Sequence, residues 1–322
     1  MSKRLLFFLL LLPLLGAALW ASTPARLERT FVDVDLPGDL DDWLDIRERS
    51  VAESFGLIPG TEKRITWFTE GERTAWSVVY LHGFSATRQE TAPLSGIVAR
   101  ALGANLFETR LSGHGRERAP LTAVRAEDWL ADAAEALAIG SAIGERVVVI
   151  GTSTGATLAA AMLDDPAMEA VDTLVMLSPN FEPRDPGAAW LTRPAGPLLA
   201  SLFVGDTRSW EPYNKKQGRY WSTTYPMAAA VEMMRLVDLA KQKLPGTITQ
   251  RLLLFYSPDD EVISPTAALA IVENTAAPHK SAIKIRDPGD PSHHVLAGDV
   301  LSAATTQEIA DDIVAFIERQ AP

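Results

Sequence analysis

A serine that lies between a predicted strand and a predicted helix constrains this chain more than any other feature. Residues 147–150 read Val-Val-Val-Ile, a run without a polar face that is typical of a buried parallel strand. Residues 156–163, which are rich in Ala and Leu, favour a helix. The link at residues 151–155, Gly-Thr-Ser-Thr-Gly, has glycine at both ends, where a tight turn brings backbone close to backbone. The sequence therefore predicts a strand, a sharp turn and a helix with Ser153 exposed at the apex, which is the context of a nucleophile elbow.

Candidate partners for this serine follow it in the order acid then histidine, which the elbow architecture requires. Two predicted strands end in such partners: residues 252–256 run into Asp259, Asp260 and Glu261, and residues 281–286 lead to His293 and His294. A serine hydroxyl attacks an ester at neutral pH when an imidazole takes its proton, and that imidazole needs a carboxylate on its far nitrogen. The three groups stand at successive strand ends and are expected to converge. Chemistry alone does not choose between the neighbouring acids or between the two histidines.

Four further motifs accompany the serine turn. They are His82-Gly83-Phe84 after a predicted strand at residues 78–81, Gly113-His114-Gly115, Asp260-x-Val262-Ile263 and Ser292-x-His294-Val295. With these motifs the chain resembles the α/β-hydrolase superfamily from about residue 65 to the C-terminus, and within it the carboxylesterases and monoacylglycerol lipases. The resemblance implies an α/β fold, a mostly parallel sheet flanked by helices with a helical cap inserted.

The resemblance also implies catalytic roles. Ser153 is the expected nucleophile, His294 the proton shuttle and Asp260 the carboxylate that orients the imidazole. The backbone N–H groups of Phe84 and Thr154 form the expected oxyanion hole, and one such donor is worth roughly 2.7–4 kcal/mol of the barrier. The chemistry implied needs neither a metal nor an organic cofactor.

Motif spacing chooses between the neighbouring candidates. The acid of the family motif precedes a valine by two positions, which selects Asp260 over Asp259 and Glu261. The histidine of the family motif follows a serine by two positions, which selects His294 over His293.

An insertion separates the predicted strand at residues 173–177 from the one at residues 252–256. About 70 residues lie between them, far more than a crossover helix needs. The resembling families place a cap over the serine here, at about residues 181–245. Its Trp, Tyr and Met residues predict an apolar pocket for the acyl group.

The N-terminus differs in character from the rest of the chain. Residues 1–21 combine a basic start with an apolar run and small residues, which predicts a signal peptide or an uncleaved N-terminal membrane anchor. Either alternative places the catalytic part outside the cytoplasm, secreted, periplasmic or tethered to a membrane. Residues 22–62 form a lead segment with a short predicted helix near residues 40–50, and residues 63–322 form the predicted hydrolase domain.

Helix signals also mark several later segments. Apolar spacing predicts helices from about residue 91 to 102 and over residues 127–139, with Gly140 beyond the second. Ser264 followed by proline opens a predicted helix over residues 266–272. Thr305 and Glu308 have capping-box spacing ahead of the last apolar stripe.

Composition excludes several functions. The chain has no Cys, which removes disulfides, thiol nucleophiles and Cys-based metal sites. Its net charge of −11 argues against nucleic acid as a partner. We expect a serine hydrolase of small-molecule carboxylic esters with an apolar acyl group. Thioesterase, amidase or aminopeptidase, and acyltransferase activities remain alternatives on the same fold, and a non-catalytic envelope binding protein is the rival from another class.

Overall fold

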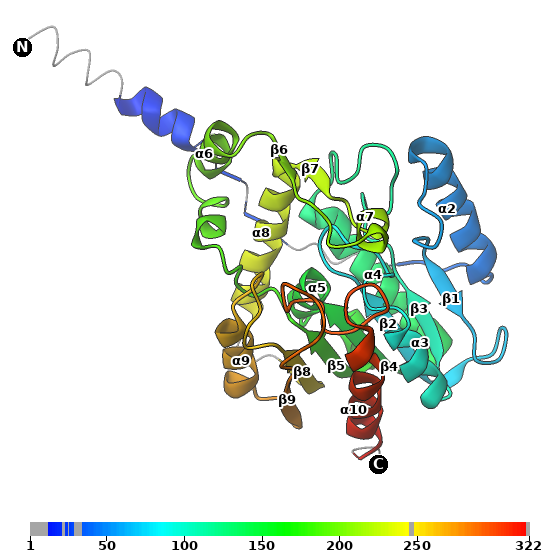
Figure 1. Cartoon of the computed structure of the whole chain (residues 1–322). Coiled ribbons are helices and arrows are strands. Elements are labelled where there is room, and N and C mark those ends of the chain that lie inside the picture. Colours follow the sequence, from blue (N-terminus) through cyan, green and yellow to red (C-terminus); the bar gives the residue numbers. More distant parts are fainter. Residues whose placement is uncertain (1–11, 21–22, 25, 29–33, 245–247, 320–322) are drawn as a thin grey trace, which may run out of the picture.

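A seven-stranded sheet forms the centre of the computed structural model, which describes residues 12–20, 23–24, 26–28, 34–244 and 248–319 (Figure 1). The strand order is β1-β3-β2-β4-β5-β8-β9, and neighbours run parallel except β1, which pairs antiparallel with β3. The strands are β1 (Arg64–Thr66), β2 (Thr74–Leu81), β3 (Asn105–Glu108), β4 (Gly144–Thr152), β5 (Val171–Leu177), β8 (Arg251–Tyr256) and β9 (Lys280–Lys284). This is the mostly parallel α/β sheet that the sequence predicts.

Helices and short 3-10 turns join these strands. Those outside the cap are α2 (Leu40–Phe55), α3 (Leu94–Ala101), α4 (Ala126–Ile143), α5 (Thr154–Ala161), η1 (Pro166–Ala170), α9 (Pro265–Asn274), η3 (Ala303–Thr305) and α10 (Thr306–Glu318). Because parallel strands end at the same edge of a sheet, the loops after β2, β4, β8 and β9 meet there.

Both faces of the sheet are covered. In β4, Val147 and Val149 belong to one hydrophobic core, and Val148 and Ile150 belong to the other. Helices α4, α5 and α8 pack on the first face, and α3 and α10 pack on the second. This two-sided burial explains why residues 147–150 contain no polar position.

The cap joins β5 to β8. Its described elements are η2 (Pro186–Trp190), α6 (Gly196–Phe203), β6 (Thr207–Ser209), α7 (Lys215–Tyr220), β7 (Thr224–Pro226) and α8 (Met227–Lys243). Strands β6 and β7 form a two-stranded antiparallel ribbon, and strands of three residues leave no periodicity by which the sequence could predict them. Helix α8 packs against α5, and the other cap elements gather beyond one end of the sheet (Figure 1).

The predicted end of the second helix was wrong. Helix α4 continues through Gly140 to Ile143. A Cβ atom at Gly140 would lie 2.6 Å from Cγ2 of Val79, so the glycine lets the helix approach β2 closely. Gly140 serves packing there and is not a stop signal.

The predicted capping box was also wrong. Thr305 does precede α10, but its side chain makes no capping hydrogen bond. The chain enters α10 from the 3-10 turn η3, so Thr305 already has φ −93° and ψ −9° rather than the extended conformation of a usual N-cap. Its hydroxyl donates to the carbonyl of Leu296 at 2.6 Å instead.

Buried ion pairs join the lead segment to the hydrolase domain. Arg110 donates to both carboxylate oxygens of Glu48 on α2, each at 2.7 Å. Lys63, the next residue after the lead segment, donates its backbone N–H to Glu48 at 3.1 Å, and its side chain bonds Asp132 at 2.9 Å and Glu135 at 2.6 Å on α4. Removing one partner of such a network leaves a buried charge, which costs about 3–5 kcal/mol.

The predicted signal peptide or anchor lies mainly outside the described residues. Residues 12–20 form a helix, and residues 1–11 and 21–22 are not described. Within the described residues, no helix combines the length and the apolar character needed to cross a membrane.

Candidate active site

Ser153 occupies a strained turn between β4 and α5. Its φ is +51° and its ψ is −115°, a backbone conformation that residues other than glycine rarely adopt. The turn is fixed by a 2.9 Å hydrogen bond from Ser153 N to the carbonyl of Leu177. A Cβ at Gly155 would lie 2.0 Å from the carbonyl oxygen of Leu81, and one at Gly151 would lie 2.7 Å from backbone atoms of Ala156. The two glycines are therefore required for the elbow that the sequence predicts.

His294 and Asp260 meet at the same edge of the sheet. Asp260 follows β8 and His294 follows β9. Nδ1 of His294 lies 2.8 Å from Oδ2 of Asp260, and both side chains are buried. The other carboxylate oxygen of Asp260 accepts from the amides of Val262 at 2.8 Å and Ile263 at 2.9 Å. The ionised Asp260 carboxylate can only accept hydrogen bonds, so Nδ1 of His294 must carry the proton that it shares with Asp260. Nε2 of His294 is then unprotonated and can accept a proton.

The neighbours that motif spacing rejects do not hydrogen-bond to the His294 ring in the described part of the chain. Asp259 and Glu261 are exposed, whereas Asp260 is fully buried. His293 has φ +54°, and its Nδ1 has no hydrogen-bond partner in the described part of the chain. The structure brings Asp260 and His294 together and does not bring Asp259 to either histidine.

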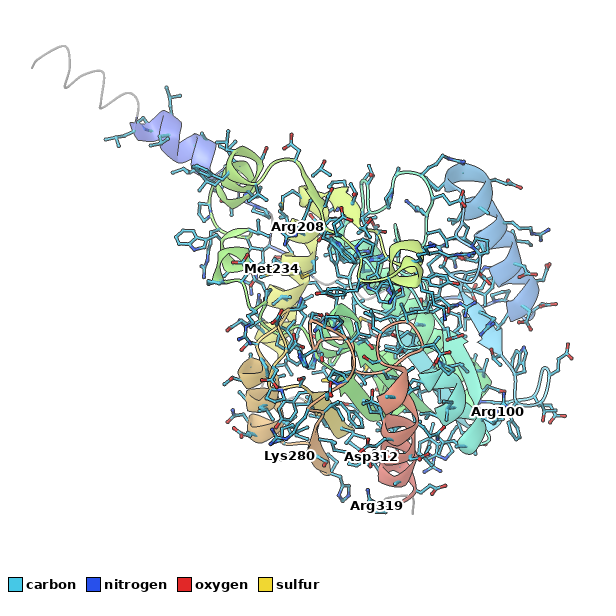
Figure 2. All side chains as sticks on the ribbon, in the orientation of Figure 1. Arg100, Arg208, Met234, Lys280, Asp312 and Arg319 are labelled. Atoms are coloured by element: carbon cyan, nitrogen blue, oxygen red, sulfur yellow. The ribbon has the colours of Figure 1, made fainter. Side chains whose placement is uncertain are left out.

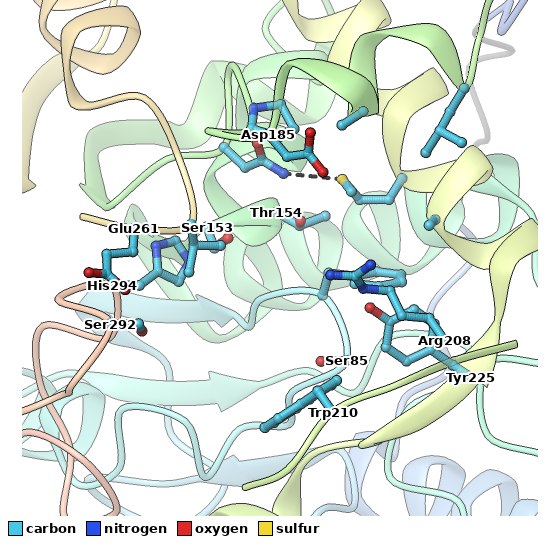
Figure 3. Close-up of a pocket in the computed structure, with 18 of the residues that line it drawn as sticks. Ser85, Ser153, Thr154, Asp185, Arg208, Trp210, Tyr225, Glu261, Ser292 and His294 are labelled. Carbon is cyan, nitrogen blue, oxygen red and sulfur yellow. Dashed lines mark hydrogen bonds between the residues drawn. The ribbon is translucent and has the colours of Figure 1, made fainter. Parts of the chain in front are cut away.

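Ser153 and His294 line one cavity, and Figure 3 shows the imidazole beside the serine. Ser153 is 6 % exposed, so its hydroxyl faces the cavity rather than bulk solvent. The contacts of the described residues include no hydrogen bond from Ser153 Oγ to His294. In an empty site that bond is often long and tightens when substrate binds.

The pKa of His294 is raised above its ordinary value of 6.5. Burial lowers this pKa, but the neighbouring carboxylates together raise it by more, and the charge and hydrogen bond of Asp260 contribute most. The charges of Glu90 and Asp290 raise it further. The imidazolium that a proton transfer creates is therefore stabilised in this site.

Asp290, which the sequence analysis missed, holds the loop that carries His294. Oδ2 of Asp290 accepts from the amides of His294 at 3.0 Å and Val295 at 2.9 Å, and from the hydroxyl of Ser292 at 2.7 Å. Asp290 is 2 % exposed. An acid four residues before the predicted histidine, on the same loop, is the sequence feature that could have indicated this role for Asp290.

Phe84 and Thr154 also line the cavity. Thr154 is the first residue of α5, where backbone N–H groups have no partner within the helix. Neither the Phe84 nor the Thr154 N–H donates to another described residue. Both amides are therefore available to a ligand atom in the cavity.

Two buried histidines fix the loop that carries Phe84. His82 accepts from the amide of Leu111 and His114 accepts from the amide of Ser85, both at 3.0 Å. The two rings pack edge to face with centroids 4.9 Å apart. Burial lowers the pKa of His82 to about 4 and that of His114 well below its ordinary value, so both rings are neutral at pH 7. They hold the backbone in place and stand outside the Ser153, His294 and Asp260 set.

Glu90 is a further buried carboxyl that sequence reasoning missed. Its Oε2 accepts from the amide of Gly83 at 2.8 Å and from the hydroxyl of Tyr80 at 3.1 Å. A Cβ on Gly83 would lie 2.7 Å from Oε1 of Glu90 and 3.3 Å from Cβ of Ser153, so these two side chains face each other across Gly83. Burial raises the pKa of Glu90 to about 7, although the amide of Gly83 and the charge of His294 both oppose that rise.

A cavity of about 590 Å³ connects this edge of the sheet with the cap, which is within the usual range for small-molecule sites. Its apolar lining comes mainly from the cap, which contributes Trp190, Leu191, Leu199, Ala200, Val204, Trp210, Trp221, Tyr225, Met227, Ala230 and Met233. The described part of the chain holds no group of three or more His, Asp or Glu side chains placed to bind a metal ion.

Comparisons with solved structures show the same fold. The chain is similar to a structure of the metagenome-derived lipolytic enzymes LipS and LipT, with 21 % identity and a TM-score of 0.67 over 82 % of this chain and 100 % of that one. It is similar to a monoacylglycerol lipase of Paleococcus ferrophilus, with 14 % identity and a TM-score of 0.59 over 80 % and 98 %. It is also similar to a soluble variant of monoglyceride lipase from Saccharomyces cerevisiae, with 10 % identity and a TM-score of 0.58 over 93 % and 99 %. At these identities the likeness is one of fold.

The sequence comparisons agree with this architecture. No curated protein matches the chain in sequence. The sequence model of the alpha/beta hydrolase family matches residues 78–303, which include Ser153, Asp260 and His294. The expected superfamily is thereby confirmed, and the esterase and lipase neighbours agree with a hydrolase: the chain belongs to the alpha/beta hydrolase family.

Proposed function

We propose that the protein hydrolyses carboxylic esters through an acyl-enzyme on Ser153. The observation that carries this proposal is the placement of a serine on a strained, buried elbow beside His294, whose far nitrogen lies 2.8 Å from the buried Asp260. Such an arrangement supplies a nucleophile, a base and a group that orients the base.

In the proposed first half-reaction, Nε2 of His294 takes the proton of Ser153 Oγ as that oxygen bonds to the ester carbonyl carbon. The carbonyl oxygen becomes an oxyanion, which the N–H groups of Phe84 and Thr154 are free to bind. The imidazolium, stabilised by Asp260, then gives its proton to the leaving alcohol. In the second half-reaction water attacks the acyl-enzyme with His294 again as base, and the acid and free Ser153 are released.

The cap supports an apolar acyl group as substrate. Its aromatic, Met and Leu side chains form most of the cavity wall, and such walls bind hydrocarbon through the hydrophobic effect. The names of the similar structures include lipolytic enzymes and a monoacylglycerol lipase, which favours an ester over a thioester or an amide.

A fluorophosphonate probe tests the proposed nucleophile. Intact-protein mass spectrometry should show one added probe, and digestion should place it on Ser153. The same preparation should hydrolyse p-nitrophenyl esters, and a series from acetate to dodecanoate measures the preferred acyl length. A chain that neither reacts with the probe nor hydrolyses any ester of the series would be a binding protein on this fold.

A further inference from the structure

Arg208 is the one arginine or lysine among the described residues that line the cavity beside Ser153. Figure 2 labels it on β6 of the cap ribbon, and the strand register pairs it with Tyr225 of β7. Figure 3 shows its side chain reaching over Tyr225 into the cavity. No carboxylate of the described residues forms an ion pair with it. The cavity therefore contains an arginine whose charge the described protein does not neutralise.

Tyr225 fixes where this charge is held. Its ring packs edge to face against Phe84, with centroids 5.1 Å apart, and the phenol is mostly buried. The guanidinium of Arg208 lies beside the phenol, and its charge opposes the rise that burial gives to the pKa of Tyr225. Phe84 also supplies a candidate oxyanion amide. Arg208 therefore lies beside Tyr225, Tyr225 packs on Phe84, and Phe84 lies at the Ser153 end of the cavity.

Arg208 is exposed, so solvent stabilises its charge while the cavity is empty. The cap wall around it is largely apolar, including Trp210 and Tyr225, and a ligand that fills the cavity takes the place of solvent on the side of the guanidinium that faces the cavity. A charge that loses solvent contact without gaining a partner is destabilised. A neutral hydrocarbon would impose that cost, whereas a ligand with its own anionic group would not.

The acidic groups of the cavity restrict where an anion can lie. They are Glu90, Asp185, Glu261 and Asp290. Figure 3 shows Glu261 beside His294 and well apart from Arg208. An anionic group is repelled near His294 and attracted near Arg208. The field of the cavity therefore orients a ligand with its charged end toward β6 and its uncharged ester toward Ser153.

We propose that Arg208 binds a carboxylate or phosphate that the ester substrate carries away from the bond that is cleaved. This inference rests on the proposed esterase function and narrows its substrates to esters with a remote anionic group. Guanidinium forms two parallel hydrogen bonds with such groups, which suits Arg better than Lys. The anion can belong to the acyl part or to the alcohol part of the ester.

Two ester pairs that differ in a remote carboxylate test the proposal on the full chain. On the acyl side the pair is the p-nitrophenyl monoester of octanedioate and p-nitrophenyl octanoate. On the alcohol side the pair is the butanoate ester of 6-hydroxyhexanoate and hexyl butanoate, followed by acid release. The readout is the ratio of kcat/KM for the anionic ester to that for the neutral one.

Arg208→Gln should lower this ratio about tenfold in one of the two pairs, since a charge-assisted hydrogen bond to an exposed side chain changes an affinity by about that factor. Arg208→Lys should keep part of the ratio. Arg219→Ala is the matched control, because Arg219 is an exposed cap arginine that does not line the cavity. Its ratio should equal that of the wild type. Added salt should lower the wild-type ratio and leave that of Arg208→Gln unchanged.

A binding measurement separates failure of this inference from failure of the esterase proposal. The N-methyl amides of octanoate and of octanedioate are not esters, and the second carries a free carboxylate. Calorimetry should show tighter binding of the octanedioate amide to the wild type and no such preference in Arg208→Gln, whether or not the protein cleaves esters. Equal affinities for the two amides, or a ratio that Arg208→Gln leaves within twofold in both ester pairs, would overturn the assignment of Arg208.

Discussion

The sheet edge that holds Ser153 and the cap that covers it are built in opposite ways. At the sheet edge Asp260 and His294 are buried, and backbone amides occupy the remaining acceptor positions of Asp260. In the cap, helix α6 exposes Leu202 at 69 % and Phe203 at 84 % of their surfaces. Positions at the sheet edge are set by close backbone contacts, whereas α6 is held through Gly196 and Ala200 on one face and leaves most of its large apolar side chains exposed.

Under the proposed function, the sheet edge carries out the reaction and the cap selects the substrate. A displacement of about 1 Å in a reacting group can cost a hundredfold in rate, so the reacting groups need a rigid support. A wall that accommodates hydrocarbon needs only apolar surface of about the right size. We therefore expect changes at the sheet edge to act on kcat and changes in the cap to act on KM, and the following predictions are ordered from the largest effect to the smallest.

The largest effect is expected at Ser153. Ser153→Ala should lower kcat for p-nitrophenyl butanoate about 10⁶-fold, the loss seen when such a nucleophile is removed. The fold should survive, because Ala keeps the Cβ atom and the elbow is held by Leu177 O, Gly151 and Gly155. Circular dichroism and thermal unfolding check the fold. Activity within tenfold of the wild type would contradict the proposed nucleophile.

The adjacent carboxylates provide a matched pair. Asp260→Asn should lower kcat about 10⁴-fold, since an amide at that position stabilises the wrong tautomer of His294. Asp259→Asn should stay within about threefold of the wild type, because Asp259 is exposed and makes no contact with the imidazole. The reverse ranking in steady-state kinetics would show that the orienting carboxylate is Asp259.

The histidine pair tests the same point on the other loop. His294→Ala should be as inactive as Ser153→Ala, because the two groups act as a unit. His293→Ala should keep most activity, although its φ of +54° predicts some change in loop stability. Full activity in His294→Ala would leave Ser153 without a base and contradict the mechanism.

Some of this site could be predicted from the sequence, and some could not. Ser153, Asp260 and His294 were predictable because each follows a recognisable strand within a short motif of fixed spacing. Glu90 and Asp290 were not, because their importance comes from the amides and the hydroxyl groups that the fold brings to them. Arg208 lies on a strand of three residues, which has no pattern.

The fold shows the same limit. Strand and helix periods identified β4, α5 and α10, whose apolar faces are set locally. The end of α4 was predicted too early because the role of Gly140 depends on β2, more than 50 residues earlier in the chain. Thr305 was misread as a cap because nothing local shows that a 3-10 turn precedes α10.

The rising limb of the pH profile tests the charges around His294. In the proposed mechanism neutral imidazole is the active form, and the pKa of His294 is raised, so kcat/KM should rise with pH around a midpoint above 6.5. The negative charge of Glu90 helps to raise the pKa of His294, so Glu90→Gln should lower that pKa and move the midpoint to lower pH. The plateau should fall no more than about tenfold, since Gln still accepts from Gly83 N. Glu261→Gln removes an exposed charge from the same cavity and should move the midpoint less.

The smallest effect is expected in the cap, where two leucines of α6 form a matched pair. Leu199 lines the cavity and is 43 % exposed, whereas Leu202 is 69 % exposed and does not line it. Leu199→Ala should raise KM for p-nitrophenyl octanoate roughly threefold, because each methylene buried against an acyl chain is worth at most about 0.8 kcal/mol and Leu199 is only partly buried. Its kcat should not change, and KM for the acetate ester should not change, since a two-carbon acyl group does not reach the cap wall. Leu202→Ala should alter neither constant with either ester.

If Leu199→Ala instead lowered kcat for the acetate ester, the cap would be holding the reacting groups in place, and the division between a rigid reacting edge and a selecting cap would be wrong.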